Sequence, residues 1–171
     1  MEKKKDFFIS LIIVFLVIGF FIFLIFFSLD KEKVSGLKPE VNSGTKNLDI
    51  NKIQYIKIAD KILKVELALT PEAQQQGLSG REKLKEDEGM FFVFNHMDKY
   101  SFWMKDMNFA LDIIWIGEDL RVVYIKKNAL PESYPETFRP SQEVRYVLEV
   151  LAQFSEKNNL KEGDQIEILL P

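Results

Sequence analysis

One short stretch of the sequence gathers an aromatic ring, an ammonium group and two carboxylates: Trp103, Lys105, Asp106 and Asp112. An aromatic face with hydrogen-bond acceptors is what carbohydrate recognition requires, because the ring covers the apolar face of a sugar and the acceptors bind its hydroxyl groups. Trp103 would then be a stacking platform, Lys105 an anion contact and Asp112 an acceptor. In the structural alternative, Asp112 caps a turn or pairs with Lys105 or Arg81. Trp103 then lies in the core.

Other titratable groups offer less specific chemistry. The single histidine, His96, suits general-base chemistry near neutral pH, but no nucleophile is close in sequence, which favours a solvated loop residue. The acidic run 86–88 offers oxygens to a hard cation but lacks the alternating spacing of a calcium loop, which favours a solvated charge run. Asp112 with Glu143 or Glu149 would form the carboxylate pair of a glycoside hydrolase if the two groups lay about 5–10 Å apart. We assign no catalytic residue, metal ligand or cofactor.

Composition excludes several kinds of site and partner. The 171 residues include no cysteine, which rules out disulfides, thiolate metal sites, a cysteine nucleophile and a lipidated N-terminal cysteine. One histidine rules out any site that needs two imidazoles, including most zinc sites. The formal net charge of −3 argues against nucleic-acid binding, since phosphate contacts require a basic surface. No phosphate-binding loop, dinucleotide fingerprint or Gly-x-Ser-x-Gly motif is present.

The start of the chain predicts a membrane anchor. Residues 7–29 carry no charge, and as a helix they would be about 34 Å long, enough to cross a hydrocarbon core of about 30 Å. Lysines at positions 3–5 precede this run, so the positive-inside rule places the N-terminus in the cytoplasm. A cleaved signal peptide is the alternative, but its apolar region is only about 7–15 residues long and ends at small residues. We therefore expect a cytoplasmic tail (1–6), a transmembrane helix (7–29), a flexible tether (30–51) and an extracytoplasmic domain (52–171).

The remaining segment has the pattern of short strands. Apolar and polar residues alternate in 62–69, and Thr70-Pro71 is a typical helix start, with a capping residue followed by proline. Strands are predicted over 54–58, 62–69, 90–94, 100–104, 111–116, 120–125, 144–150 and 165–169, with a polar loop over 95–99 and a proline-rich loop from 131 to 140. This pattern predicts a mainly β domain, a compact antiparallel β-sandwich or barrel-like fold with one or two short helices.

Several motifs resemble the domain of unknown function 192 family. They are Gly77-Leu-Ser-Gly-Arg81, Gly89-Met-Phe-Phe-Val-Phe94, Phe102-Trp-Met-Lys-Asp106, Leu111-Asp-Ile-Ile114, Tyr146-Val-Leu-Glu149 and Gly163-Asp164. The resemblance covers roughly residues 55–169 and implies a small β-sandwich-like domain, often exported or membrane-anchored, with no established activity. This chain has Asp106-Met107 where the family usually has Asn-Thr, and Gln153 where it tends to have glycine.

Two functions remain open. The first is a membrane-anchored extracytoplasmic module that binds a cell-envelope glycan or a partner protein, with Trp103, Lys105, Asp112 and Arg81 as candidate ligand-binding residues. The second is a small carboxylate-dependent hydrolase of the glycoside type at the cell surface. Few titratable groups lie near any nucleophile, which favours the first. We expect a single-pass protein of the cell membrane whose partners are the bilayer, through residues 7–29, and an envelope glycan or protein, with no cofactor and no nucleic acid.

Overall fold

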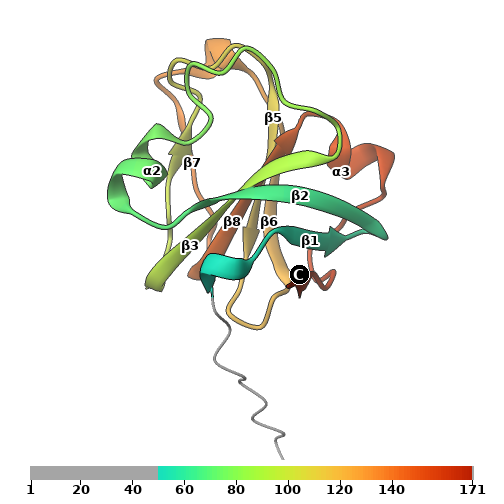
Figure 1. The fold of residues 1–171 in the computed structure, drawn as a ribbon. Helices are drawn as coiled ribbons and strands as arrows, with labels where there is room; N and C mark the ends of the chain where they lie inside the picture. Colours follow the sequence, from blue (N-terminus) through green and yellow to red (C-terminus); the bar gives the residue numbers. More distant parts are fainter. Residues whose placement is uncertain (1–49, 171) are drawn as a thin grey trace, which may run out of the picture. The chain divides into compact units, whose positions relative to one another are not determined.

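Residues 50–170 are the part of the chain that the structure, a computed structural model, describes (Figure 1). The predicted membrane anchor (7–29) and nearly all of the predicted tether (30–51) lie outside these residues. Within residues 50–170, no helix has the length and apolar character needed to cross a membrane.

Short strands dominate the described residues. In chain order the elements are η1 (Ile50–Lys52), β1 (Tyr55–Ile58), β2 (Lys61–Ala68), α2 (Pro71–Gln76), β3 (Glu88–Asp98), β4 (Phe102–Trp103), β5 (Leu111–Ile116), β6 (Val122–Ala129), η2 (Pro131–Ser133), β7 (Thr137–Phe138), β8 (Val144–Leu151), α3 (Phe154–Lys157) and β9 (Glu167–Leu169). The fold is mainly β with two short α-helices, which confirms the predicted class.

The strands form one large curled sheet and one small sheet. The large sheet has the order β6-β5-β8-β3-β2-β1-β9, and β4 pairs with β7 in the small one. All neighbours are antiparallel except β2 and β3, which run parallel. Parallel neighbours require a crossover connection, and here that connection carries α2. The predicted all-antiparallel arrangement is therefore wrong at this pair, and the curled sheet is a half-barrel.

The two edges of the large sheet meet at one end. Arg121, just before β6, forms a β-bridge with Gln165, just before β9. The backbone N–H of Val122 donates to the carbonyl of Asp164 (2.9 Å), and that of Ile166 donates to the carbonyl of Leu120 (2.9 Å). These bonds occupy backbone groups that an open edge would leave free to pair with another chain.

Successive side chains of the strands point to opposite faces, and each face of the sheet carries a hydrophobic core. The first, the Phe91 core, is enclosed by the curl and includes Phe91, Val93, Ile114, Ile116, Leu148 and Val150. The second, the Phe92 core, includes Met90, Phe92, Phe94, Ile113, Trp115 and Val147. Side chains from α2 and from residues 100–109 pack against the Phe92 core. Any cleft between those segments therefore opens onto the Phe92 core.

Two local predictions have different outcomes. The helix start is confirmed: the Thr70 hydroxyl accepts a hydrogen bond from the N–H of Ala73 (3.2 Å), and Pro71 is the first helical residue. The prediction of a polar loop over residues 95–99 is wrong, because β3 continues to Asp98. Its polar end remains a strand because pairing with β8 resumes at Asp98, opposite Val144, after a register shift.

Candidate functional site

Two of the sequence motifs lie side by side and are held by hydrogen bonds. The hydroxyl of Ser79 donates to the carbonyl of Lys105 (2.8 Å), and the N–H of Gly80 donates to the carbonyl of Asp106 (2.8 Å). The side-chain amide of Asn108 donates to the carbonyl of Arg81 (2.8 Å). The segment after α2 is thereby fixed against the loop that carries the candidate residues.

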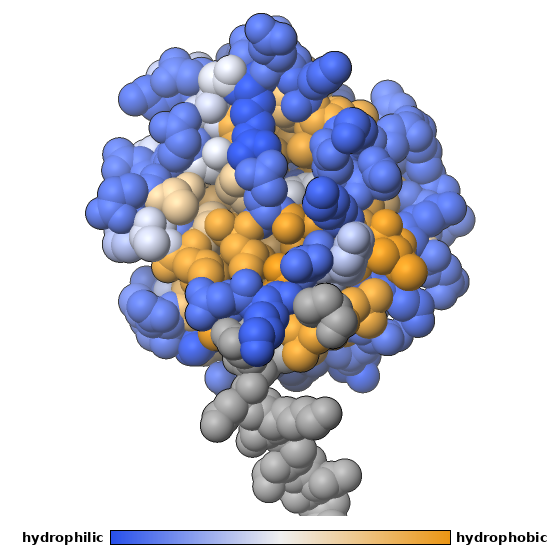
Figure 2. Space-filling model, in the orientation of Figure 1, coloured by the Kyte–Doolittle hydropathy of each residue, from blue (hydrophilic) through white to orange (hydrophobic). Residues whose placement is uncertain are grey.

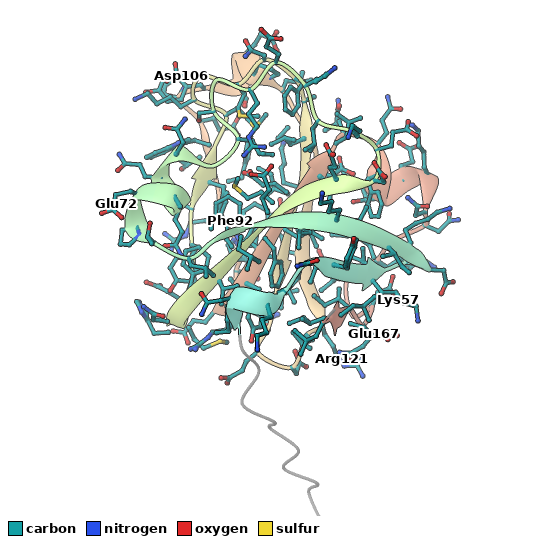
Figure 3. All side chains as sticks on the ribbon, viewed as in Figure 1. Lys57, Glu72, Phe92, Asp106, Arg121 and Glu167 are labelled. Carbon is teal, nitrogen blue, oxygen red and sulfur yellow. The ribbon has the colours of Figure 1, made fainter. Side chains whose placement is uncertain are left out.

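Two cavities lie between these segments. The outer cavity, about 390 Å³, is lined mainly by polar side chains: Glu72, Gln75, Gln76, Ser79, Trp103, Lys105 and Asp106. The inner cavity, about 220 Å³, shares Gln75, Gln76, Ser79 and Trp103 with it and adds Phe94, Tyr100, Phe102, Met107 and Glu149. Figure 3 shows Glu72 on α2 and Asp106 on the loop beyond it, and the surface around α2 is hydrophilic in Figure 2. The outer cavity therefore forms a polar mouth, and the inner cavity combines aromatic rings with the glutamines of α2 and with Glu149.

Trp103 lies at the junction of the two cavities. Its side chain belongs to the short strand β4, opposite Thr137 of β7, and it is 41% exposed. The neighbouring residue Phe102 points into the Phe92 core, where its ring meets that of Phe92 edge-on at 4.9 Å. The structural alternative that placed Trp103 in the core is therefore wrong. Lys105 lines the outer cavity and is exposed.

Glu149 is the buried polar group of the inner cavity. It lies on β8 between β5 and β3, paired with Ile113 and Met90, and is only 4% exposed. Its Oε2 atom has no hydrogen-bond partner within residues 50–170. Burial raises the pKa of Glu149 to about 8, because a carboxylate loses its hydration in this apolar setting. The side chain is therefore mostly a neutral carboxylic acid at pH 7.

The walls of the inner cavity are tied to the sheet. The amide of Gln74 donates to the carbonyls of Ala68 (3.3 Å) and Val93 (3.0 Å). The ring of Tyr100 stacks on that of Phe94 at 3.5 Å, and the indole N–H of Trp115 donates to the carbonyl of Tyr100 (2.9 Å). These contacts fix Gln74, Phe94 and Tyr100, three residues of the cavity lining, against the sheet.

Asp112 does not belong to this site. It is fully buried, and its carboxylate accepts backbone N–H groups from Asn128 (2.8 Å), Gln153 (3.3 Å) and Ser155 (2.8 Å). Asp112 pairs with Val150 and so faces the Phe91 core, on the side of the sheet away from the cavities. The structure thus corrects its predicted place beside Trp103 and Lys105. The capping role was anticipated, although its partners are backbone groups rather than Lys105 or Arg81.

Arg81 also lies outside both cavities. Its guanidinium forms a two-pronged ion pair with Glu66 of β2, in which Nη2 lies 2.6 Å from Oε2. The hydrogen bonds from Arg81 lower the pKa of Glu66. Arg81 is therefore occupied in joining the segment after α2 to the sheet.

The predicted carboxylate pair does not form. Asp112 and Glu149 face opposite sides of the sheet, and Glu143 is an exposed residue before β8. The acidic run is engaged by lysines: Glu86 pairs with Lys157 at 3.2 Å and Glu88 with Lys85 at 2.8 Å. In residues 50–170, no group of three or more histidine or acidic side chains is arranged to hold a metal ion. His96 is exposed on β3.

The sequence alone did not identify two parts of the site, Glu149 and the glutamines at 74–76. Glu149 was considered only as a partner of Asp112, and the glutamines at 74–76 were not singled out. A signal was present for Glu149, because it interrupts the apolar run Val147-Leu148-Glu149-Val150-Leu151. A carboxylate in a buried strand must be paired, neutral or functional.

Comparisons with known proteins identify the family of this chain. The family model DUF192, described as "Uncharacterized ACR", matches residues 54–168. A crystal structure of a proposed transcription regulator from Sinorhizobium meliloti 1021 is 32% identical, with a TM-score of 0.62, covering 67% of this chain and 90% of that chain. A protein of unknown function from Novosphingobium aromaticivorans DSM 12444 has the same identity, 32%, and TM-score, 0.62, covering 66% of this chain and 81% of that one. No curated protein matches. The matched motifs form one continuous domain, and the chain belongs to the DUF192 family.

Proposed function

We propose that this chain is a membrane-anchored, extracytoplasmic module that binds a carbohydrate of the cell envelope in the two joined cavities. The observation that carries the proposal is the position of Trp103, half-exposed where the polar outer cavity meets an inner cavity that contains the rings of Phe94, Tyr100 and Phe102. An aromatic ring exposed to solvent can stack on the apolar face of a sugar, and the polar groups fixed beside it can bind the hydroxyl groups of that sugar.

The polar groups of the mouth support this proposal. Gln75 and Gln76 of α2 offer amide donors and acceptors, Asp106 offers a carboxylate and Lys105 an ammonium group. Sugar hydroxyl groups both donate and accept hydrogen bonds, so a mixed set of this kind can satisfy them. A purely apolar partner would displace the water from these polar groups and offer them no hydrogen bonds in its place.

The hydrolase alternative receives less support. A raised pKa such as that of Glu149 is a property of a general acid in glycoside hydrolysis. The mechanism also needs a second carboxylate across the bond, and Asp112, the residue proposed for that role, lies on the other face of the sheet. The net charge of −3 likewise favours a carbohydrate over DNA as the ligand.

The membrane location rests on the sequence of residues 7–29 and on the lysines before them. Protease added to intact spheroplasts should remove the domain and spare the N-terminal tail. A domain that stays protected in intact cells and becomes sensitive only after lysis would contradict this topology.

Binding is tested with the full-length protein in a detergent without a sugar headgroup. Soluble cell-wall glycan fragments should shift its NMR or tryptophan-fluorescence signals in a saturable manner. Trp103→Ala should weaken binding at least about fivefold, because stacking on an aromatic ring is worth about 1 kcal/mol or more.

Tyr134→Ala is the matched control, since Tyr134 is 47% exposed and lines neither cavity. It should leave binding unchanged. Equal binding by wild type and Trp103→Ala, or no saturable binding of any fragment, would refute the proposal. Release of shortened fragments during the assay would instead support the hydrolase.

A further inference from the structure

The inner cavity has an unusual distribution of polar groups. Its apolar lining includes Leu78, Phe94, Phe102 and Met107, its neutral polar lining comes from the glutamines at 74–76 and the serines at 79 and 101, and Glu149 is its acidic residue. Glu149 lies more than nine-tenths buried, and within residues 50–170 its Oε2 atom has no hydrogen-bond partner. An unpaired polar atom in such a place costs free energy unless a ligand completes its hydrogen bonding.

The protonation state of Glu149 determines which ligand group fits. Burial raises its pKa to about 8, so near neutral pH it carries a proton and donates a hydrogen bond. The complementary group is a neutral acceptor. An ammonium group would need an ionised partner, and a bare hydrocarbon would leave Oε2 unsatisfied.

We propose that the inner cavity binds the acetamido group of an N-acetylated sugar, whose carbonyl oxygen accepts a hydrogen bond from the Glu149 carboxylic acid. This inference rests on the proposed carbohydrate function and specifies its ligand class. The sugar ring lies against Trp103, which lines both cavities, and the acetamido group extends from the ring into the inner one.

The walls match the rest of that group. The acetamido methyl requires apolar contact, which Phe94 and Met107 offer. A hydroxyl group in place of the acetamido group would bring no methyl group to these side chains. An acetamido group is also small enough for a cavity of about 220 Å³. Selectivity for the N-acetyl group therefore arises inside the inner cavity, and general sugar affinity arises at its mouth.

The test compares N-acetylglucosamine with glucose on the full-length protein, by NMR titration at pH 6.5 and pH 9.5. At pH 6.5, N-acetylglucosamine should bind about tenfold or more tightly than glucose, because one buried hydrogen bond and the methyl contact are gained. At pH 9.5 this preference should fall several-fold, since an ionised Glu149 repels the carbonyl oxygen instead of donating to it.

Two variants assign the effect to Glu149. Glu149→Gln keeps an N–H donor of similar shape but has no proton to lose, so its preference should persist and become independent of pH. Glu149→Leu removes the donor and should reduce the preference to about that of the methyl contact alone. The affinity for glucose is measured with each variant as well, so that the preference is a ratio within one protein. Tyr134→Ala, at a position that lines neither cavity, should keep both affinities of the wild type.

The outcomes separate this inference from the proposed function. Equal affinities for the two sugars, or a preference that survives unchanged in Glu149→Leu, would overturn the inference while leaving carbohydrate binding in place. Absence of binding for both sugars, together with absence of binding for glycan fragments, would overturn both. If Glu149→Gln does not fold, the wild-type protein still tests the role of Glu149. A preference for N-acetylglucosamine over glucose that stays constant from pH 6.5 to 9.5 refutes that role.

Discussion

Two buried carboxyl groups on neighbouring strands have opposite surroundings. Asp112 of β5 and Glu149 of β8 are 0% and 4% exposed, and they lie one position apart in the register that joins their strands. Asp112 accepts three backbone N–H groups, whereas Oε2 of Glu149 has no partner in the described part of the chain. Burial alone therefore does not separate a carboxyl group that holds the backbone from one that is left without a partner. Hydrogen bonding does.

The difference follows from where each residue lies along its strand. Asp112 is near the start of β5, close to the end of β6 and to the turn after β8. Backbone N–H groups of these two segments take no part in strand pairing and donate to Asp112 instead. Glu149 lies within β8 between two paired neighbours, so the surrounding backbone donors are already engaged. Only a side chain or a ligand can reach it, and no side chain of residues 50–170 forms a hydrogen bond with its Oε2 atom.

The largest expected effect is a pH dependence of the free energy of unfolding that arises from Glu149. In the unfolded chain its pKa is near the usual 4.5, and in the folded protein it is about 8. Between these values the folded state keeps a proton that the unfolded state loses, so stability should fall as pH rises, by up to about 1.4 kcal/mol per pH unit. Below this window and above it, Glu149 should contribute no pH dependence. Glu149→Gln should lack the slope, as measured by urea unfolding from pH 4 to 9.

This prediction also tests the comparison itself. Glu143→Gln, at an exposed position, is the matched control and should keep the wild-type slope. If Glu149→Gln kept that slope as well, Glu149 would not retain its proton in the folded protein, and the contrast between the two carboxyl groups would disappear.

Asp112→Asn should cost roughly 3 kcal/mol of unfolding free energy at pH 7. Asparagine has nearly the same shape, but its amide nitrogen would face a backbone N–H, leaving a buried donor unsatisfied and weakening the remaining bonds. Chemical denaturation measures the loss. Sugar binding by the folded variant should be unchanged, since Asp112 lies on the far face of the sheet. A loss of binding without a loss of stability would reverse the roles assigned to the two residues.

A smaller effect is expected at Gln153, whose N–H donates to Asp112. Gln153 has φ of 72°, a left-handed conformation that costs a residue with a side chain about 1 kcal/mol. Gln153→Gly keeps the N–H and relieves this cost, so it should stabilise the domain by up to about 1 kcal/mol. Gln153→Ala, the control, should give no such gain. A gain from both variants would point to the exposed glutamine side chain rather than to the backbone.

Strand positions were largely predictable, because alternation and apolar runs mark half-buried and buried strands. This holds for β1, β2, β5 and β8, and the cap at Thr70 marked α2. The parallel pairing of β2 with β3 was not predictable, since the same side-chain pattern fits either direction. Trp103 was predicted on a strand, with a pocket and a core position both open, and the structure places it on β4 with 41% of its surface exposed. Only the register of β5 against β8 reveals that Asp112 and Glu149 face opposite cores.

The pairing of β1 has a mechanical consequence. β1 is the first strand after position 50, yet it lies inside the sheet, with β2 on one side and β9 on the other. A pull on the chain from its N-terminal side would load both ladders in shear, so several hydrogen bonds would have to break together. An edge strand can instead be peeled away one bond at a time. A domain held from that side at a cell surface, as we propose here, would resist force where its own chain enters the sheet.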